Sequence, residues 1–145
     1  TRTDINYWVM TFSESKEFQV HSSSLKEIRV FAREVLSKDD IFKSTKDDVV
    51  LALAEAAQNI VKHAYNGAAT SDNLKIKISY NNNQLKIDLY DKGEPAIPTN
   101  IKPRDVDDIK PGGLGTFFIG QIMDEVLFKT AATDWVNHLI LIKNY

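Results

Sequence analysis

The 145-residue sequence contains no cysteine, which excludes disulfide bonds and any catalytic or metal-binding thiolate. No apolar run approaches the roughly 20 residues that a membrane-spanning helix needs, and no signal-peptide pattern opens the chain. The formal net charge of -2 does not favour a nucleic-acid surface. These absences predict a cytoplasmic protein with no direct contact to membrane or nucleic acid.

Proline is scarce, and its distribution is uneven. All four prolines fall within residues 91–113, a stretch of low apolar content. A loop of this length inside a compact domain often covers a binding site, so we expect a lid over residues 94–111. The rest of the composition, with 43% hydrophobic and 26% charged residues, is ordinary. The length predicts a single domain over residues 1–145.

The longest amphipathic pattern covers residues 46–65 and predicts a helix with a broad apolar face. That face comprises Val49, Val50, Leu53, Ala56, Ala57, Ile60, Val61 and Ala64. The opposite face carries Glu55, Gln58, Asn59, Lys62 and His63, where an exposed helix usually alternates its charges. Glu55 and Asn59 are four residues apart, so their side chains meet on a helix. The helix alone leaves two readings open, a solvated surface and a binding site.

The remaining patterns predict the order of elements. Residues 7–12 indicate a strand, with a second short segment at Phe18 and Val20, and residues 25–37 indicate a helix that Ser24 would cap. Alternation in residues 74–80 and 85–90 predicts a hairpin, followed by a short helix with Phe117 and Phe118 in the core, and by strands at 126–129 and 138–143. This order provides no crossover helices for a doubly wound parallel sheet. It predicts an α+β two-layer sandwich: a mostly antiparallel sheet with three helices on one face.

Two further polar clusters adjoin predicted elements. Asp91, Lys92 and Gly93 follow a strand, where a carboxylate can accept a hydrogen bond from an amine such as that of adenine. Taken alone, this cluster is explained more simply by an Asp-x-Gly turn. The other cluster precedes a helix, and glycine N–H groups at a helix N-terminus suit phosphate, although the pattern is neither a Walker loop nor a dinucleotide fingerprint. It comprises Gly112, Gly113, Leu114, Gly115 and Thr116.

Together the three clusters supply what phosphoryl transfer needs. The amide oxygen of Asn59 is a ligand type that Mg²⁺ accepts, and the carboxylate of Glu55 can take a proton from a hydroxyl or a water. The glycine cluster would hold phosphate, and the long loop would close the site.

The wording and order of these clusters resemble the GHKL, or histidine-kinase-like, ATPase superfamily, which has the Bergerat-type ATP-binding fold. EAAQN followed by KHAY resembles its N-box, and DKGEP resembles its Asp-x-Gly box. GGLGTFFI followed by MDEV resembles its second glycine box, in the form used by the anti-sigma factor serine/threonine kinases of bacterial partner-switching systems. The resemblance runs from about Ser22 to the C-terminus.

The resemblance implies a serine/threonine kinase that depends on ATP and Mg²⁺. Asn59 would hold Mg²⁺ against the nucleotide phosphates, and Glu55 would be the general base or a water-orienting carboxylate. Asp91 would bond the adenine amine, while Gly93 would let the base lie close. The remaining nucleotide-binding residues would be Lys62, His63, Gly112, Gly113, Leu114, Gly115 and Thr116.

The resemblance also implies partners: a STAS-type anti-anti-sigma protein as substrate, a sigma factor or another regulator, and a second copy in a homodimer. One departure is Asn137-His138, which stands where family members often have a threonine near the adenine. Two alternatives stay open. One is a catalytically weak nucleotide-binding module that sequesters a regulator. The other is a domain excised from a larger signalling protein, since the chain begins at Thr1.

Overall fold

The computed structural model describes residues 11–64, 70–95, 99–101, 113–131 and 134–145. In chain order the elements are β1 (Phe12–Gln19), η1 (Ser22–Ser24), α2 (Leu25–Leu36), η2 (Asp40–Phe42), α3 (Lys46–Asn59), η3 (Ile60–Ala64), β2 (Asn73–Asn81), β3 (Gln84–Asp91), β4 (Thr99–Ile101), α4 (Gly113–Ile122), β5 (Glu125–Thr130) and β6 (Asn137–Asn144).

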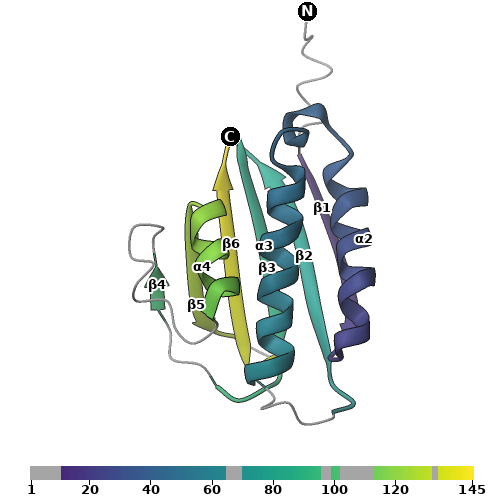
Figure 1. The fold of residues 1–145 in the computed structure, drawn as a ribbon, viewed down its shortest axis with the longest axis vertical. Helices are drawn as coiled ribbons and strands as arrows, with labels where there is room; N and C mark the ends of the chain where they lie inside the picture. Colours follow the sequence, from purple (N-terminus) through teal and green to yellow (C-terminus); the bar gives the residue numbers. More distant parts are fainter. Residues whose placement is uncertain (1–10, 65–69, 96–98, 102–112, 132–133) are drawn as a thin grey trace, which may run out of the picture.

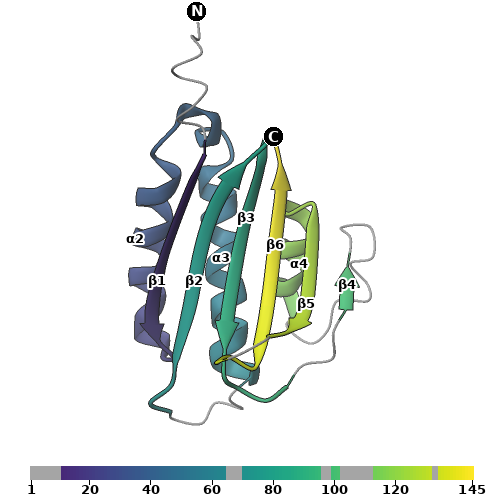
Figure 2. The same ribbon diagram turned by 180° about the vertical axis from the view of Figure 1, so that it is seen from behind.

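The strands form one six-stranded sheet in the order β1-β2-β3-β6-β5-β4. Every neighbouring pair is antiparallel. Helices α2, α3 and α4 lie against one face of this sheet (Figure 1), and the view from behind shows the other face without a described helix (Figure 2). The predicted α+β two-layer sandwich is therefore confirmed. No helix of the described residues is long and apolar enough to cross a membrane.

The central hairpin follows from alternation and from its turn. Leu74, Ile76 and Ile78 of β2 are fully buried, while the lysines between them are half-buried. Asn82 and Asn83 connect β2 to β3 with φ values of 52° and 61°. A two-residue hairpin loop with positive φ at both positions matches the right-handed twist of the strands, and asparagine tolerates that conformation. The predicted hairpin is confirmed.

Helix α3 is fixed by its apolar face. Val49, Leu53 and Ala57 are fully buried against the sheet and the neighbouring helices, whereas Leu51 is 41% exposed. Burial of large aliphatic side chains stabilises such a helix by about 1.5–3 kcal/mol for each. This packing sets the direction in which the polar side chains of α3 point.

Strand β1 differs from the prediction. The pattern suggested a strand at residues 7–12 and a separate short segment at Phe18 and Val20, but a single strand, Phe12–Gln19, pairs with β2 over its whole length. Residues 1–10 lie outside the described part of the chain. β1 is an edge strand with five polar residues in succession, so its pairing is dictated by β2 and leaves no apolar alternation in the sequence.

Two local predictions are wrong. Ser24 makes no side-chain cap on α2, because the short helix η1 precedes it and Ser24 already has helical dihedral angles. Phe118 was expected in the core but is 42% exposed. Helix α4 is apolar around most of its circumference, so the sequence did not indicate which side faces inward. Ile119 on the same helix is buried, as is Met123 just beyond its end.

Candidate functional site

Three elements meet at one end of the molecule. In Figure 1, α3 runs down to Asn59, β3 runs down to Asp91, and α4 begins at the same lower end with Gly113. Helices α3 and α4 pack against each other on the helix-covered face of the sheet. The fold therefore brings the three sequence clusters to a common edge.

The polar face of α3 is only partly exposed to solvent. Glu55, Gln58 and Asn59 are half-buried, and Lys62 is exposed. Directly after Asn59 the helix widens into a π-helical turn, Ile60–Ala64. Such turns are rare in proteins, and those that occur are often found at functional sites. The sequence predicted one continuous helix to residue 65 and gave no sign of this turn; the side chain of His63, within it, lies outside the described residues.

Asp91 is a buried acceptor at the end of β3, with 3% of its surface exposed. Its Oδ1 accepts hydrogen bonds from the Gly93 N–H at 2.8 Å and from Asn137 Nδ2 at 2.9 Å. Burial raises the pKa of Asp91, while the bonds from Asn137 and Gly93 lower it. The Asp-x-Gly turn offered as the simpler reading is present, since the Gly93 N–H closes it. A surface turn would not need a carboxylate this deeply buried.

Asn137, which in the sequence is only part of a departure from the family pattern, contacts this turn directly. It is buried and lies opposite Asp91 in the β3–β6 ladder. Its Nδ2 also donates to the Glu94 carbonyl at 2.9 Å, and the Val136 N–H donates to the Asp91 carbonyl at 2.8 Å. The turn after β3 is therefore tied to the start of β6. The available signal was a polar residue in phase with the inward-facing leucines of that strand.

Most of the glycine cluster lies within helix α4 and not in a loop before it. Gly113, Leu114, Gly115 and Thr116 form the first turn of α4, whereas the sequence suggested a loop before the helix. Gly112 lies outside the described residues, as do the side chains of 113–117. The first N–H groups of a helix have no partner within it, so they are available to an anion. The expected phosphate cradle would thus be the helix terminus itself.

The predicted lid falls mostly outside the described residues. Within residues 94–111 the structure describes Glu94, Pro95 and the strand β4, Thr99–Ile101. β4 pairs with β5, from Thr99 opposite Phe128 to Ile101 opposite Val126. This segment therefore contains a short edge strand that the sequence, read as a loop, did not reveal.

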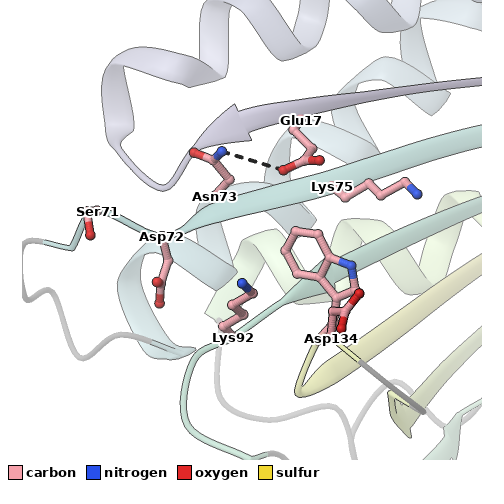
Figure 3. Close-up of a pocket in the computed structure, with 8 residues that line it drawn as sticks. Glu17, Ser71, Asp72, Asn73, Lys75, Lys92 and Asp134 are labelled. Atoms are coloured by element: carbon pink, nitrogen blue, oxygen red, sulfur yellow. Dashed lines mark hydrogen bonds between the residues drawn. The ribbon is translucent and has the colours of Figure 1, made fainter.

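A hollow of about 610 Å³ lies beside the turn at Lys92 (Figure 3). Lys75 lines it from the sheet face away from the helices, since it alternates with the buried Leu74 and Ile76. Lys92 Nζ lies 5.3 Å from the ring centroid of Trp135. Of the three polar clusters identified in the sequence, only Lys92 lines this hollow, whose lining is Glu17, Ser71, Asp72, Asn73, Lys75, Lys92, Asp134 and Trp135.

The fold and this polar edge define a class of protein. The family described as "Histidine kinase-like ATPase domain" matches residues 18–143, so the chain belongs to that family. The resemblance to the superfamily is confirmed, and membership makes ATP the nucleotide of this domain.

Among the relatives with curated names, the chain is similar to two proteins called Serine-protein kinase RsbW. The protein from Staphylococcus epidermidis is 33% identical over 105 residues, which cover 67% of this chain and 63% of that protein. The protein from Staphylococcus aureus (strain bovine RF122 / ET3-1) is 34% identical over the same shares. The match spans less than two thirds of the length of these relatives.

Proposed function

We propose that the chain is an ATP- and Mg²⁺-dependent serine/threonine protein kinase that acts in partner switching. Its substrate would be a STAS-type anti-anti-sigma protein, and it would also bind a sigma factor or a similar regulator. One observation carries this proposal: the polar face of α3, the buried Asp91 and the first turn of α4 share one edge of an ATPase-family fold. The relatives named as serine-protein kinases support a hydroxyl as the phosphate acceptor.

Asp91 would hold the base of the nucleotide. A buried carboxylate with two donors on Oδ1 is held in one orientation, and its second oxygen can accept a hydrogen bond from an exocyclic amine. Gly93 has no side chain to obstruct a flat base. In this arrangement the adenine end of ATP lies beside β3.

Asn59 and the first turn of α4 would hold the triphosphate. Mg²⁺ prefers hard oxygen ligands and keeps waters and phosphate oxygens around it, and the half-buried amide of Asn59 offers such an oxygen. When bound, the ion supplies neutralisation of the phosphate charge. The N–H groups at the start of α4 would bind phosphate oxygens directly.

Glu55 would act as the general base, one helical turn before Asn59. Its carboxylate would accept the proton of the substrate hydroxyl as that oxygen bonds to the γ-phosphorus. The bond between the γ-phosphorus and the bridging oxygen then breaks, and ADP leaves with the electron pair. The half-buried position of Glu55 leaves it reachable by a protein hydroxyl.

The experiment combines transfer with binding. The full chain is incubated with γ-labelled ATP, Mg²⁺ and a purified STAS-domain protein, and label on the STAS protein is measured. Glu55→Gln should retain ATP binding and lower transfer by about 100-fold or more, as expected for loss of a general base. Asp48→Asn, in the first turn of the same helix, is the control and should leave both unchanged.

A second pair of variants tests the metal ligand. Asn59→Ala should weaken Mg·ATP binding by about tenfold or more, whereas Gln58→Ala removes the same chemical group one position away and should have a small effect. If wild-type protein binds ATP but transfers no label to the STAS protein, the kinase hypothesis is rejected. The alternative, a nucleotide-binding regulator, would then remain. An unchanged transfer rate in Glu55→Gln would refute the assigned role of that residue.

A further inference from the structure

Asn137, at the start of β6, donates a hydrogen bond to the carboxylate of Asp91 at the end of β3. Asn137 is 8% exposed and Asp91 is 3% exposed, and the two are direct partners in the antiparallel register. Asn137 Nδ2 lies 2.9 Å from Asp91 Oδ1 and 2.9 Å from the Glu94 carbonyl oxygen. One amide group therefore connects the carboxylate to the backbone of the turn that follows it.

The orientation of this amide is determined by its partners. Both atoms near Nδ2 are oxygens that can only accept, a carboxylate oxygen of Asp91 and a backbone carbonyl of Glu94. A flipped amide would place its own oxygen against both of them. The NH₂ group of Asn137 is therefore committed to these two bonds, one proton to each.

These contacts leave the two oxygens of Asp91 unlike each other. Oδ1 accepts from Asn137 and from the Gly93 N–H, whereas Oδ2 accepts no hydrogen bond from the described residues. No fully enclosed side-chain nitrogen or oxygen of the described residues lacks a hydrogen-bond partner, so Oδ2, which has none, is not completely enclosed. A ligand approaching the end of β3 would meet Oδ2 as an acceptor to which no described side chain donates.

The geometry points to Asn137 as the positioning residue that makes this site selective for an amino-substituted purine over an oxo-substituted one. Adenine presents an NH₂ donor where hypoxanthine presents a carbonyl oxygen. A fixed carboxylate oxygen pairs with the first and repels the second. Without Asn137 the carboxylate loses one of its two fixed donors and can turn, so the discrimination falls. This inference rests on the proposed function, because it concerns the base of the nucleotide that Asp91 would bind.

The test compares ATP with inosine triphosphate. Both nucleotides are titrated with Mg²⁺ into the full chain by calorimetry, and the ratio of the two dissociation constants is the readout. A site built to bond an NH group rejects an analogue without it strongly, so the wild-type ratio should be about 100-fold or more. Asn137→Ala should lower the ratio by about tenfold or more, mainly by weakening ATP. Asn144→Ala, an exposed asparagine on the same strand, should leave it unchanged.

A matched pair of variants, Asn137→Thr and Asn137→Val, separates loss of the hydrogen-bond donor from a general effect on folding. Threonine and valine have nearly the same shape and suit a strand, but only threonine keeps a donor. Asn137→Thr should retain most of the wild-type ratio, and Asn137→Val should lose it. Equal ratios in these two variants, or equal weakening of both nucleotides in Asn137→Ala, would overturn the inference while wild-type ATP binding still supports the proposed function. Wild-type protein that binds neither nucleotide would overturn both.

Discussion

His138 Nε2 lies 2.7 Å from Asp88 Oδ1. The two residues alternate with the core residues Leu89 and Leu139, so they lie on the sheet face that no described helix covers (Figure 2). The Asp88 side chain is only 4% exposed, and Lys86 Nζ lies 3.9 Å from the same carboxylate oxygen. Tyr90 stacks on the imidazole at 4.2 Å between ring centroids. A buried carboxylate on this face is thus held by a diagonal neighbour on β6, because its direct partner in the β3–β6 ladder is Ile140.

The first prediction is that His138→Ala lowers the free energy of unfolding by about 1–3 kcal/mol, because Asp88 is left buried without its nearest partner. Urea denaturation provides the measurement. His21→Ala, which removes an exposed imidazole bonded to Ser23, should change it by less than about 0.5 kcal/mol. Adding Asp88→Asn to His138→Ala should recover part of the loss, and a strictly additive double variant would refute the coupling.

The second prediction concerns pH and Asp91. In the folded protein, burial raises the pKa of this carboxyl above its ordinary value of 3.8. The folded state therefore holds the proton more tightly than the unfolded state, so stability present below pH 3.8 is lost as pH rises through the raised pKa. Asp91→Asn has no titrating carboxyl at this position, so its stability should not show this loss as pH rises.

Urea denaturation of the two proteins between about pH 4 and pH 8 checks this sign. The stability of wild type relative to Asp91→Asn should fall as pH rises and then level off. A difference that grows in favour of wild type with rising pH would show that the hydrogen bonds outweigh burial.

The third prediction tests what holds α3 in place. Leu53 is fully buried, so Leu53→Ala should cost about 2–5 kcal/mol through lost transfer energy and the remaining cavity. Leu51→Ala, two residues away and 41% exposed, should cost less than about 1 kcal/mol. Guanidinium denaturation of both variants decides, and similar losses would mean that the apolar face does not anchor the helix.

The periodicity of hydrophobic residues predicts most of the helices and strands. The alternation around Ile76 and Ile87 and the helical spacing around Leu53 report side chains that face a core, so these elements were predictable. β1 and β4 are edge strands whose pairing depends on a neighbour, and the inward side of α4, with Phe118 exposed, depends on α3 and the sheet. Local sequence contains none of that information.

The residues of the candidate site also fall into a group that local sequence predicts and a group that it does not. Glu55, Asn59 and Asp91 are close to their helix or strand ends, so local motifs are enough to predict them as site residues. Asn137 is 46 residues from Asp91 along the chain, and only strand pairing brings the two together. The π-helical turn after Asn59 likewise has no marker in the residue pattern.

The most direct test of the nucleotide site is a calorimetric titration of Mg·ATP into wild type, Asp91→Asn and Asp134→Asn near pH 7.5. Asp91→Asn exchanges the buried acceptor for an amide of the same shape, and Asp134→Asn does the same to an exposed carboxylate that lines the hollow beside Trp135. We predict one ATP per chain in wild type, binding weakened at least about tenfold in Asp91→Asn, and no change in Asp134→Asn. Equal affinity in wild type and Asp91→Asn, or a loss only in Asp134→Asn, would contradict a nucleotide site at the ends of α3 and β3.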